Sequence, residues 1–340
     1  MGEFEIIANI RKVAESVPAS EVVRLGIGDD CCLLAPRPGE EIAVSTDTVV
    51  EGVHFRFSYF NHYQVGAKAM AAALSDLAAM AASPAAALAS VAMPYDKGSL
   101  EAEKLAQGLI ETGRRFGCPL IGGDLTASGE SVVVTVTVFG TVEKGKAILR
   151  SGACVGDEIW VTGTPGDAAA VLACLEAELG EKHGSLPIPG KKLKEKFLLP
   201  TPRLKEAAVL AESGPPSAMI DISDGLAADL GHLLESSGVG AHLFSESFPV
   251  SDFARSVAEA LGKPSEYFFL HGGEDYELCL TAPPGALSGS LERLEEKCHA
   301  GLRRIGIITG DGGQLVLERP DGRLETVPKT GFDHFNKLPA

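Results

Sequence analysis

The sequence predicts a mixed α/β or α+β protein with two domains, and three observations support this prediction. The chain has 340 residues, which is long for a single hydrophobic core. Its apolar and charged contents of 45% and 22% are those of an ordinary globular protein. Strand-like and helix-like segments alternate along most of the chain. We place the boundary in the Gly- and charge-rich segment 143–156, which gives domains at 1–148 and 149–340.

Sequence patterns in the N-terminal half predict alternating helices and strands. Apolar residues recur at helical spacing in 3–16, and an Ala-rich helix is expected over 63–82, ending near Pro84. The segment VVVTVTVFG at 132–140 is β-branched almost throughout and predicts the clearest strand. Further strands are expected at 41–47, ending in polar residues, and at 86–93, with a helix at 99–116.

The C-terminal half is expected to continue this alternation. Strands are predicted at 158–163, 218–222, 276–280 and 303–309, and helices at 165–179 and 225–236. The segment GDGG at 310–313 lies between two extended stretches and is expected to be a hairpin turn. The charged run KKLKEK at 191–196 is interpreted as a solvated or mobile linker.

Composition excludes several classes of function. The formal charge of −16 argues against a nucleic-acid or anionic-membrane surface, but bound metal ions could still admit a small anionic substrate. Lys68, Asp76 and Pro84 interrupt the Ala-rich stretch 67–93, so no membrane span is expected there. The seven cysteines form no CxxC pair, and the N-terminus resembles no signal peptide. We therefore expect a cytoplasmic protein with buried, reduced thiols.

Seven aspartates lie in short Gly-, Ser- or Thr-rich segments expected to be loops, or on an Ala-rich helix face. They are Asp29, Asp30, Asp47, Asp76, Asp124, Asp221 and Asp224. Carboxylates with little flanking basic charge are gathered in a fold only together with something cationic. The hard dications Mg²⁺ and Ca²⁺ take oxygen ligands of this kind. The pattern therefore predicts a multi-metal enzyme that acts on an anionic substrate.

Each motif also has a purely structural interpretation. GIGDD at 26–30 is compatible with a tight turn, and STDT at 45–48, at the end of a strand, with a helix cap or an ST-turn. Asp76 has Ala and Met one turn away, so it either faces solvent or requires a partner. Ser223 or Asp224 in DISDG is a natural helix N-cap, which leaves Asp221 unexplained.

The remaining motifs are weaker alone. Two glycines before Asp124 would allow a phosphate to approach backbone N–H groups. GTPGD at 163–167 could bind phosphate at a helix start, although an ordinary helix N-terminus explains it equally well. Glu274 and Asp275 follow a Gly pair and precede a strand, and His54 is a lone histidine with a structural role as its default. No P-loop, protein-kinase or GxSxG motif is present, so nucleotide chemistry here requires a metal-dominated site.

Taken in order, these segments resemble the thiamine-monophosphate kinases. The resemblance is carried by GIGDDCCLL, STDTVVEGVHF, LSDLAAM, IGGDLTAS, RSGACVGDEIWVTGTPGD, MIDISDGLAADLGHLL, HGGEDYEL and GFDHF. It implies ATP-dependent phosphorylation of thiamine monophosphate to thiamine diphosphate. It also implies the two-domain fold shared with aminoimidazole ribonucleotide synthetase, in which an N-terminal mixed sheet forms a homodimer and a C-terminal α/β domain completes the substrate site.

The resemblance also implies roles for individual residues. The Mg²⁺ ligands would be Asp30, Ser45, Thr46, Asp47, Asp76, Asp124, Asp221 and Asp224. The ATP contacts would be Gly123, Asp124, Arg150 and Ser223, and the thiamine phosphate contacts His54, Glu274 and Phe332. Phe332 stands where family members often carry Tyr, which would preserve stacking but not a hydroxyl hydrogen bond. Asp29 and the Cys31–Cys32 pair receive no role.

These assignments imply direct phosphoryl transfer without a general base, because a phosphate monoester oxygen is already largely anionic at neutral pH. Several Mg²⁺ ions, with Arg150, would offset the repulsion between ATP and the acceptor. Two other readings stay open. One is another ATP-dependent enzyme of the same superfamily, such as an aminoimidazole ribonucleotide synthetase. The other is a non-catalytic metal- or nucleotide-binding protein, which dispersed single aspartates fit poorly.

Overall fold

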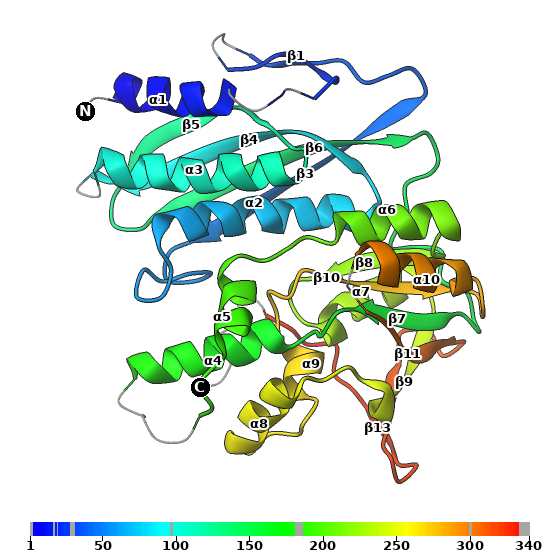
Figure 1. The fold of residues 1–340 in the computed structure, drawn as a ribbon. Coiled ribbons are helices and arrows are strands. Elements are labelled where there is room, and N and C mark those ends of the chain that lie inside the picture. The colour runs from blue at the N-terminus through cyan, green and yellow to red at the C-terminus, as the bar shows by residue number, and fades with distance from the viewer. Residues whose placement is uncertain are drawn as a thin grey trace. The chain divides into compact units, whose positions relative to one another are not determined.

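The computed structural model describes residues 3–15, 18, 20–27, 31–95, 98–180, 186–298 and 301–332. The chain forms two compact units, coloured by residue number in Figure 1. The first comprises residues 1–77, 82–147 and 198–204, and the second comprises 78–81, 148–197 and 205–340. Each unit contains its own mixed sheet and its own helices, in agreement with the predicted α/β class.

The sheet of the first unit has four strands in the order β3–β6–β4–β5. Their bounds are β3 Glu40–Val50, β4 Ser83–Pro94, β5 Leu120–Ser128 and β6 Val133–Glu143. β6 pairs antiparallel with β3 and β4, whereas β4 and β5 are parallel. A separate two-stranded sheet joins β1 (Val23–Leu25) to β2 (Leu33–Leu34). The edge strands β3 and β5 of the larger sheet carry the STDT and GGD motifs.

The helices of the first unit are α1 (Glu3–Glu15), α2 (His62–Ala79) and α3 (Ser99–Arg115), which lie along the sheet in Figure 1. Val134, Val136 and Val138 alternate into the core from β6 and are fully buried. Leu77 of α2 lies against Gly140 on the same face of β6. Helix α2 is therefore packed on the face that also carries Ser45 and Asp47, which pair with Val138 and Val136.

Glycines allow α2 and α3 to approach each other closely. A Cβ atom on Gly108 of α3 would lie 2.0 Å from the carbonyl oxygen of Tyr63 in α2. A Cβ atom on Gly66 of α2 would lie 2.0 Å from the carbonyl oxygen of Leu105 in α3. Because both obstacles are backbone atoms, neither position can accept a larger residue unless the helices separate.

The second unit is built on a seven-stranded mixed sheet in the order β13–β12–β9–β11–β7–β10–β8. The strand bounds are β7 Glu158–Thr162, β8 Ala218–Ile222, β9 Gly240–Phe244, β10 Glu277–Ala282, β11 Leu302–Thr309, β12 Leu315–Glu318 and β13 Leu324–Thr326. β10 lies between β7 and β8 and pairs antiparallel with both. This arrangement places the chain before β10 beside the chain after β8.

Seven α-helices are described in the second unit. They are α4 Asp167–Leu179, α5 Lys191–Leu198, α6 Leu204–Ser213, α7 Leu226–Ser237, α8 Asp252–Ala260, α9 Tyr267–His271 and α10 Ser288–Lys297. A short 3₁₀ turn, η2, spans Ser245–Ser247. Helix α7 begins directly after β8, as the sequence predicts, and its Leu226, Leu230 and Leu233 are fully buried in the core.

Two predicted boundaries are wrong in the first unit. The strand expected to end at 47 continues to Val50, because β6 pairs with β3 along its whole length, from Glu40 opposite Glu143 to Val50 opposite Val133. Asp47 therefore lies within a strand and not at its end. Asp124 likewise lies within β5 and not in a loop, since β4 pairs with β5 through this segment.

Two further expectations are wrong in the second unit. GDGG at 310–313 does not join paired strands, because β9 lies between β11 and β12 and pairs with both. The charged run at 191–196 is part of helix α5 and not a linker, and its Lys196 side chain is only 31% exposed.

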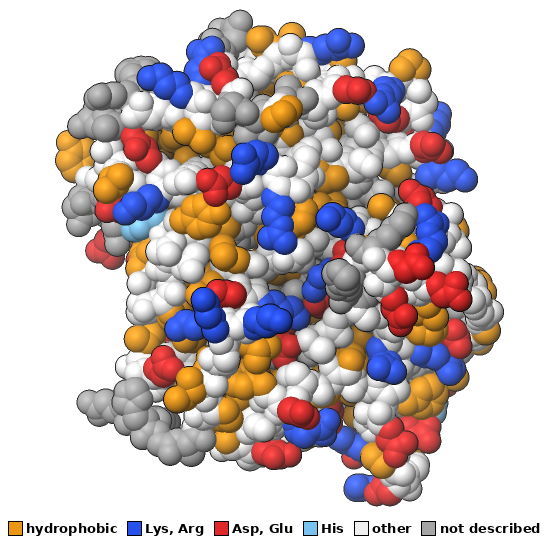
Figure 2. All heavy atoms as spheres, viewed as in Figure 1, with side chains coloured by type: hydrophobic (Ala, Val, Ile, Leu, Met, Phe, Trp, Pro, Cys, Tyr) orange, Lys and Arg blue, Asp and Glu red, His pale blue; other side chains and the backbone are white. Residues whose placement is uncertain are grey.

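The composition leads to expectations about the cysteines, the surface charge and membrane spans. All seven cysteines are free thiols, but Cys31 and Cys154 are exposed, so only some of them are buried as expected. Acidic and basic side chains are interspersed with apolar ones on the visible face (Figure 2). Among the described residues, no helix has both the length and the apolar character needed to cross a membrane.

The close approach of α2 and α3 predicts that Gly108→Ala destabilises the protein. The new methyl group would meet the Tyr63 carbonyl oxygen, and overpacking of this kind costs about 1–3 kcal/mol of the free energy of unfolding. Gly289→Ala in α10 is the matched control, because its Cβ atom would meet nothing within 4 Å. That variant should gain up to about 1 kcal/mol from helix propensity. Urea unfolding of both variants measures the difference, and equal stabilities would contradict the packing argument.

Candidate functional site

Ser45 and Asp76 form one contact between predicted metal ligands. The hydroxyl of Ser45 on β3 donates a hydrogen bond to the carboxylate of Asp76 on α2, and both side chains are half-buried. Asp76 projects from an Ala-rich helix, so this contact supplies the polar partner that its burial requires. The neighbouring Thr46 lies on the other face of β3, where its hydroxyl is 3.0 Å from that of Thr137.

Asp47 and Asp124 lie on opposite edge strands of the same sheet. Asp47 is level with Gly123, with Val136 of β6 and Ala89 of β4 between them. Three interstrand spacings separate the two edges by roughly 14 Å along the sheet. A Cβ atom on Gly123 would lie 1.9 Å from the carbonyl oxygen of Ala89, so only glycine fits beside β4 at this point. The sheet alone therefore does not bring these two carboxylates into contact.

His54 is held in a defined orientation by the backbone. The N–H of Val50 donates to Nδ1 of His54 at 3.1 Å, which places the proton of a neutral imidazole on Nε2. The ammonium of Lys68, a fully buried residue of α2, donates to the carbonyl oxygen of His54 at 2.9 Å. The loop that carries His54 is therefore tied to α2 by a buried lysine that sequence patterns do not single out.

Three sequence-distant motifs meet in the second unit. The N–H of Glu274 donates to the carbonyl oxygen of Ser223 at 2.7 Å, and the N–H of Phe332 donates to that of Asp224 at 3.1 Å. Glycines permit these contacts, since Cβ atoms on Gly273 and Gly331 would lie 2.6 Å and 2.4 Å from the same two carbonyl oxygens. The segments DISDG, GGEDYEL and GF at 331–332 therefore form one loop cluster. This loop cluster includes Ser223, one of the predicted ATP contacts, together with Glu274 and Phe332, two of the predicted contacts with thiamine phosphate.

Asp229 organises the DISDG loop, and sequence reasoning missed it. One of its carboxylate oxygens accepts hydrogen bonds from the N–H groups of Ser223, Asp224 and Gly225 at 3.0, 3.1 and 3.2 Å. The N-cap of α7 is Gly225, without a side-chain bond, so the capping interpretation of Ser223 or Asp224 is wrong. Burial, together with the nearby carboxylates of Asp221 and Asp224, raises the pKa of Asp229 to about 8. The backbone of the loop is thus satisfied from within, by a residue one turn into the helix.

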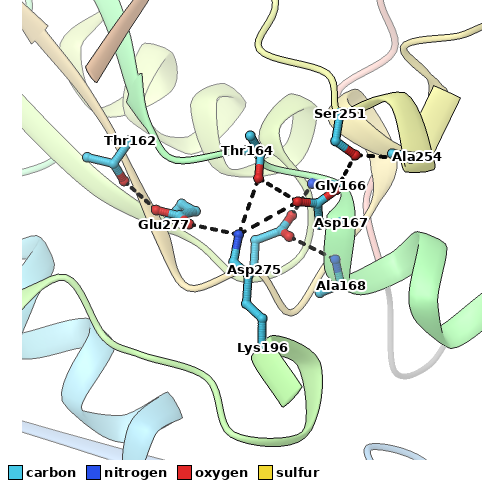
Figure 3. A network of polar contacts seen from close by, with 10 residues as sticks. All are labelled: Thr162, Thr164, Gly166, Asp167, Ala168, Lys196, Ser251, Ala254, Asp275 and Glu277. Carbon is cyan, nitrogen blue, oxygen red and sulfur yellow. Dashed lines mark hydrogen bonds and ion pairs between the residues drawn. The ribbon is translucent and has the colours of Figure 1, made fainter. Parts of the chain in front are cut away.

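A second buried carboxylate, Asp275, occupies the N-terminus of α4 (Figure 3). Its two oxygens accept hydrogen bonds from the N–H groups of Gly166 and Ala168 at 2.6 and 3.2 Å. Burial raises the pKa of Asp275 to about 8, and the two N–H groups and Lys196 partly oppose this rise. Because Asp275 accepts from two N–H groups at this helix end, the interpretation of GTPGD as an ordinary helix start is favoured over a phosphate site.

Lys196 of α5 lies among the carboxylates that surround Asp275. Its ammonium is 3.3 Å from Glu277 and 3.9 Å from Asp167, and it donates to the hydroxyl of Thr164 at 3.4 Å (Figure 3). Glu277 is completely buried and also accepts a hydrogen bond from the hydroxyl of Thr162 at 2.7 Å. Asp167 accepts further hydrogen bonds from the hydroxyls of Thr164 and Ser251. The carboxylates are therefore matched by a cation and by hydroxyl donors.

The structure also places Asp221 and Arg150. Asp221 is buried on β8 opposite Leu278, whereas Arg150 is exposed and its carbonyl oxygen accepts a hydrogen bond from the Ser237 hydroxyl at 3.2 Å. Asp30 and Asp29 lie outside the described residues. Within the described part of the chain, no three His, Cys, Asp or Glu side chains are arranged to hold a metal ion. Two candidate oxygen ligands, Ser45 and Asp76, are nevertheless in hydrogen-bond contact. Asp221 and Asp224 lie close enough to Asp229 for their charges to raise its pKa.

The raised pKa of Asp275 predicts that stability falls with increasing pH. Its carboxyl group keeps its proton in the folded protein up to about pH 8 but loses it near pH 4 when unfolded. Between these values the folded state binds more protons, so the free energy of unfolding decreases as the pH rises. Urea midpoints at pH 5 and pH 8 test this, and Asp275→Asn should flatten the dependence. An unchanged slope in that variant would contradict the assignment.

Comparison with known proteins identifies both units. Residues 28–142 match the N-terminal domain model of the AIR synthase related proteins, and residues 155–318 match the C-terminal domain model. The thiamine-monophosphate kinase of Escherichia coli (strain K12) is 38% identical over 338 residues, which is 98% of each chain. The crystal structure of the thiamine-monophosphate kinase from Stenotrophomonas maltophilia superposes on this structure with a TM-score of 0.79. Its sequence is 35% identical to this chain, and the match covers 95% of this chain and 97% of that chain.

A third match is a structure of the protein named AaThiL, complexed with AMPPCP and TMP. It is 31% identical, has a TM-score of 0.73, and covers 98% of this chain and 97% of that chain. Similarity therefore extends over both units and across the motifs that form the loop cluster. On this basis the chain belongs to the thiamine-monophosphate kinase family of AIR synthase related proteins.

Proposed function

We propose that this protein transfers a phosphoryl group from ATP to thiamine monophosphate and so forms thiamine diphosphate. The observation that carries the proposal is the full-length similarity to thiamine-monophosphate kinases, one relative of which is complexed with an ATP analogue and TMP. The loop cluster supports it, because Ser223, Glu274 and Phe332 are brought together by direct backbone contacts. ATP is a co-substrate in this reaction.

The two substrates would be bound by different residues. We assign ATP to Gly123, Asp124, Arg150 and Ser223, and thiamine monophosphate to His54, Glu274 and Phe332. The tautomer of His54 supports its role, since Nε2–H can donate to a phosphate oxygen while Nδ1 accepts from Val50. Phe332 is 44% exposed, so part of its ring is available for stacking on an aromatic substrate.

Mg²⁺ is the cation that this donor set would suit. Carboxylates and hydroxyls are hard oxygen ligands, and Ser45 and Asp76 already place two such groups together. The residues that would hold the ions are Asp30, Ser45, Thr46, Asp47, Asp76, Asp124, Asp221 and Asp224. Bound Mg²⁺ would neutralise phosphate charge and orient the transferring group. The wide distribution of these ligands fits several ions better than one.

The protein's own groups would mainly position and screen the reactants. The acceptor phosphate needs no general base, because its second pKa is about 6 and it is largely ionised at neutral pH. Two unit charges at about 4 Å repel each other by about 4 kcal/mol at an effective dielectric constant of 20. Arg150 would offset part of this repulsion on the ATP side, and His54 part of it on the acceptor side. We propose in-line transfer directly between the two substrates, without a phosphoenzyme.

Three properties accompany the proposal. The domains at 1–148 and 149–340 would divide the work, the first binding ATP and Mg²⁺ and forming the dimer, the second completing the substrate site. The outer face of β3 supports a homodimer, because Val44 is 58% exposed there beside the hydroxyl pairs of Thr46 and Thr48. The seven free thiols support a cytoplasmic location.

The function is tested by incubating the protein with ATP, Mg²⁺ and thiamine monophosphate and detecting thiamine diphosphate by chromatography. Asp47→Asn and Asp124→Asn should each lower kcat by about 100-fold or more, because each removes a charged ligand from the phosphoryl-transfer site. Far-UV circular dichroism should show that both variants remain folded.

Parallel reactions with thiamine and with aminoimidazole precursors separate the rival enzymes. If thiamine monophosphate is not converted while an aminoimidazole precursor is, the synthetase alternative replaces the proposal. Near-normal kcat for both Asn variants at saturating Mg²⁺ would refute the metal-ligand assignment.

The exposed face of β3 predicts that Val44→Glu disrupts a dimer. A charge at the centre of an apolar interface is left without a partner when the second copy docks. Light scattering after size exclusion should give a mass near twice 35.4 kDa for the unmodified protein and near 35.4 kDa for the variant. Leu100→Glu on α3 is the control, because Leu100 is 56% exposed but lies away from the sheet face. A variant that stays dimeric would place the interface elsewhere.

A further inference from the structure

The loop 272–276, GGEDY, has an unusual backbone conformation. It connects α9 to β10, and it contains Glu274, the proposed contact with thiamine monophosphate. Glu274 and Tyr276 have φ angles of +67° and +52°, although neither is glycine. Left-handed backbone at non-glycine residues costs free energy and persists only where the surroundings impose it. Something must therefore hold this loop against relaxation.

One side of the loop is held by the end of β8. The N–H groups of Glu274 and Tyr276 donate to the carbonyl oxygens of Ser223 and Ile222 at 2.7 and 2.9 Å. These bonds fix the loop at the two residues with left-handed backbone. They leave the orientation of the residue between them, Asp275, to other contacts.

The other side is held by the side chain of Asp275. Both of its oxygens accept from the first turn of α4, through Gly166 and Ala168, and the residue is 4% exposed. The 13-residue helix presents the positive end of its dipole to this carboxylate. Gly166 also allows α9 to pack closely against this helix start, since a Cβ atom there would lie 2.6 Å from the backbone of Phe268. Asp275 thus anchors the middle of the loop to a rigid element.

Lys196 makes this anchor compatible with its acidic surroundings. Asp167 and Glu277 are buried nearby, and buried carboxylates without a cation would repel one another. The ammonium of Lys196 lies 3.3 Å from Glu277 (Figure 3). Its charge also lowers the pKa of Asp275, so it acts on both groups. Removing this charge would loosen the contact between Asp275 and α4 while leaving every residue of the loop in place.

We propose that Asp275, supported by the neighbouring Lys196, is a positioning residue for Glu274 in the binding of thiamine monophosphate. This inference rests on the proposed function and identifies a residue that would determine the affinity for one of its two substrates. Asp275 does not touch the substrate. It fixes the backbone from which Glu274 projects, so its loss should weaken binding of thiamine monophosphate more than that of ATP.

The ATP side of the loop cluster has a separate anchor, which makes the two effects separable. Asp229 holds the N–H groups of Ser223, Asp224 and Gly225 independently of α4. Displacement of Glu274 should therefore leave the proposed ATP contact at Ser223 in place. A residue that merely stabilised the fold would not distinguish between the two substrates.

A double-mutant cycle tests the proposal. Asp275→Asn replaces one hydrogen-bond acceptor by an amide donor at nearly constant volume, and Glu274→Gln removes the charge of the proposed contact. Each single variant should raise the KM for thiamine monophosphate by about tenfold and change the KM for ATP by less than about twofold. Because Asp275 acts through Glu274, the double variant should resemble Glu274→Gln alone and should not show about a hundredfold increase.

Asp157→Asn is the matched control. Asp157 is also 4% exposed and accepts from the N–H of Cys154 at 2.9 Å and the hydroxyl of Ser217 at 2.6 Å, but it precedes β7 and does not contact the loop. It should leave both KM values unchanged. If Asp275→Asn does not fold, Lys196→Met takes its place in the cycle, and Lys196→Arg should restore the KM for thiamine monophosphate.

Three outcomes would overturn the proposal. They are multiplicative effects in the cycle, equal increases in both KM values, and a folded Asp275→Asn variant that behaves like the Asp157→Asn control. Calorimetric titration with thiamine monophosphate in the presence of AMPPCP gives an independent measure of the same affinity. Failure of the unmodified protein to convert thiamine monophosphate would instead refute the proposed function, so the two failures are distinguishable.

Discussion

Hydrogen bonds from backbone N–H groups to buried carboxylates hold the functional loops of the second unit. Asp229 accepts three such bonds across the DISDG loop, and Asp275 accepts two from the start of α4. Buried backbone donors must be satisfied, and a carboxylate satisfies several at once. Loops rich in Gly, Ser and Asp could not hold one conformation by apolar packing alone. In this chain that role falls to two acidic side chains that would contact neither substrate.

In the first unit, β-strands hold the backbone of the predicted ligands. Its predicted ligands Asp47 and Asp124 lie within β3 and β5, so the ladder of the sheet fixes their backbone. Small residues allow the covering layer to come close: Gly66 and Gly108 bring two helices into backbone contact, and Gly140 admits Leu77. The Ala-rich composition of α2 therefore reflects tight packing, and Asp76 within it is supported by a single hydroxyl from Ser45.

Much of this architecture can be predicted from sequence, for identifiable reasons. β-Branched runs such as 132–140 and the strand–helix transition at 218–226 depend on local patterns, and the ordered motifs indicate the family. Pairing between distant segments has no local signal, so the place of β9 between β11 and β12 could not be foreseen, nor the continuation of β3 beyond Asp47. Asp229 and Lys196 were missed for a related reason. An acidic or basic residue inside a helix or beside a strand resembles a solvated one until its partners are known.

The contact of Asp275 with the N-terminus of α4 has a consequence for an enzyme that would bind two phosphate-bearing substrates. A helix end with unsatisfied N–H groups attracts any phosphate in solution, whether or not it can react. Here the chain supplies its own acceptor, the carboxyl group of Asp275, at that position. The N–H groups of Gly166 and Ala168 are thereby unavailable to nucleotide. They support the loop 272–276 instead. The contact between Asp275 and this helix start therefore reduces unproductive binding of phosphate there.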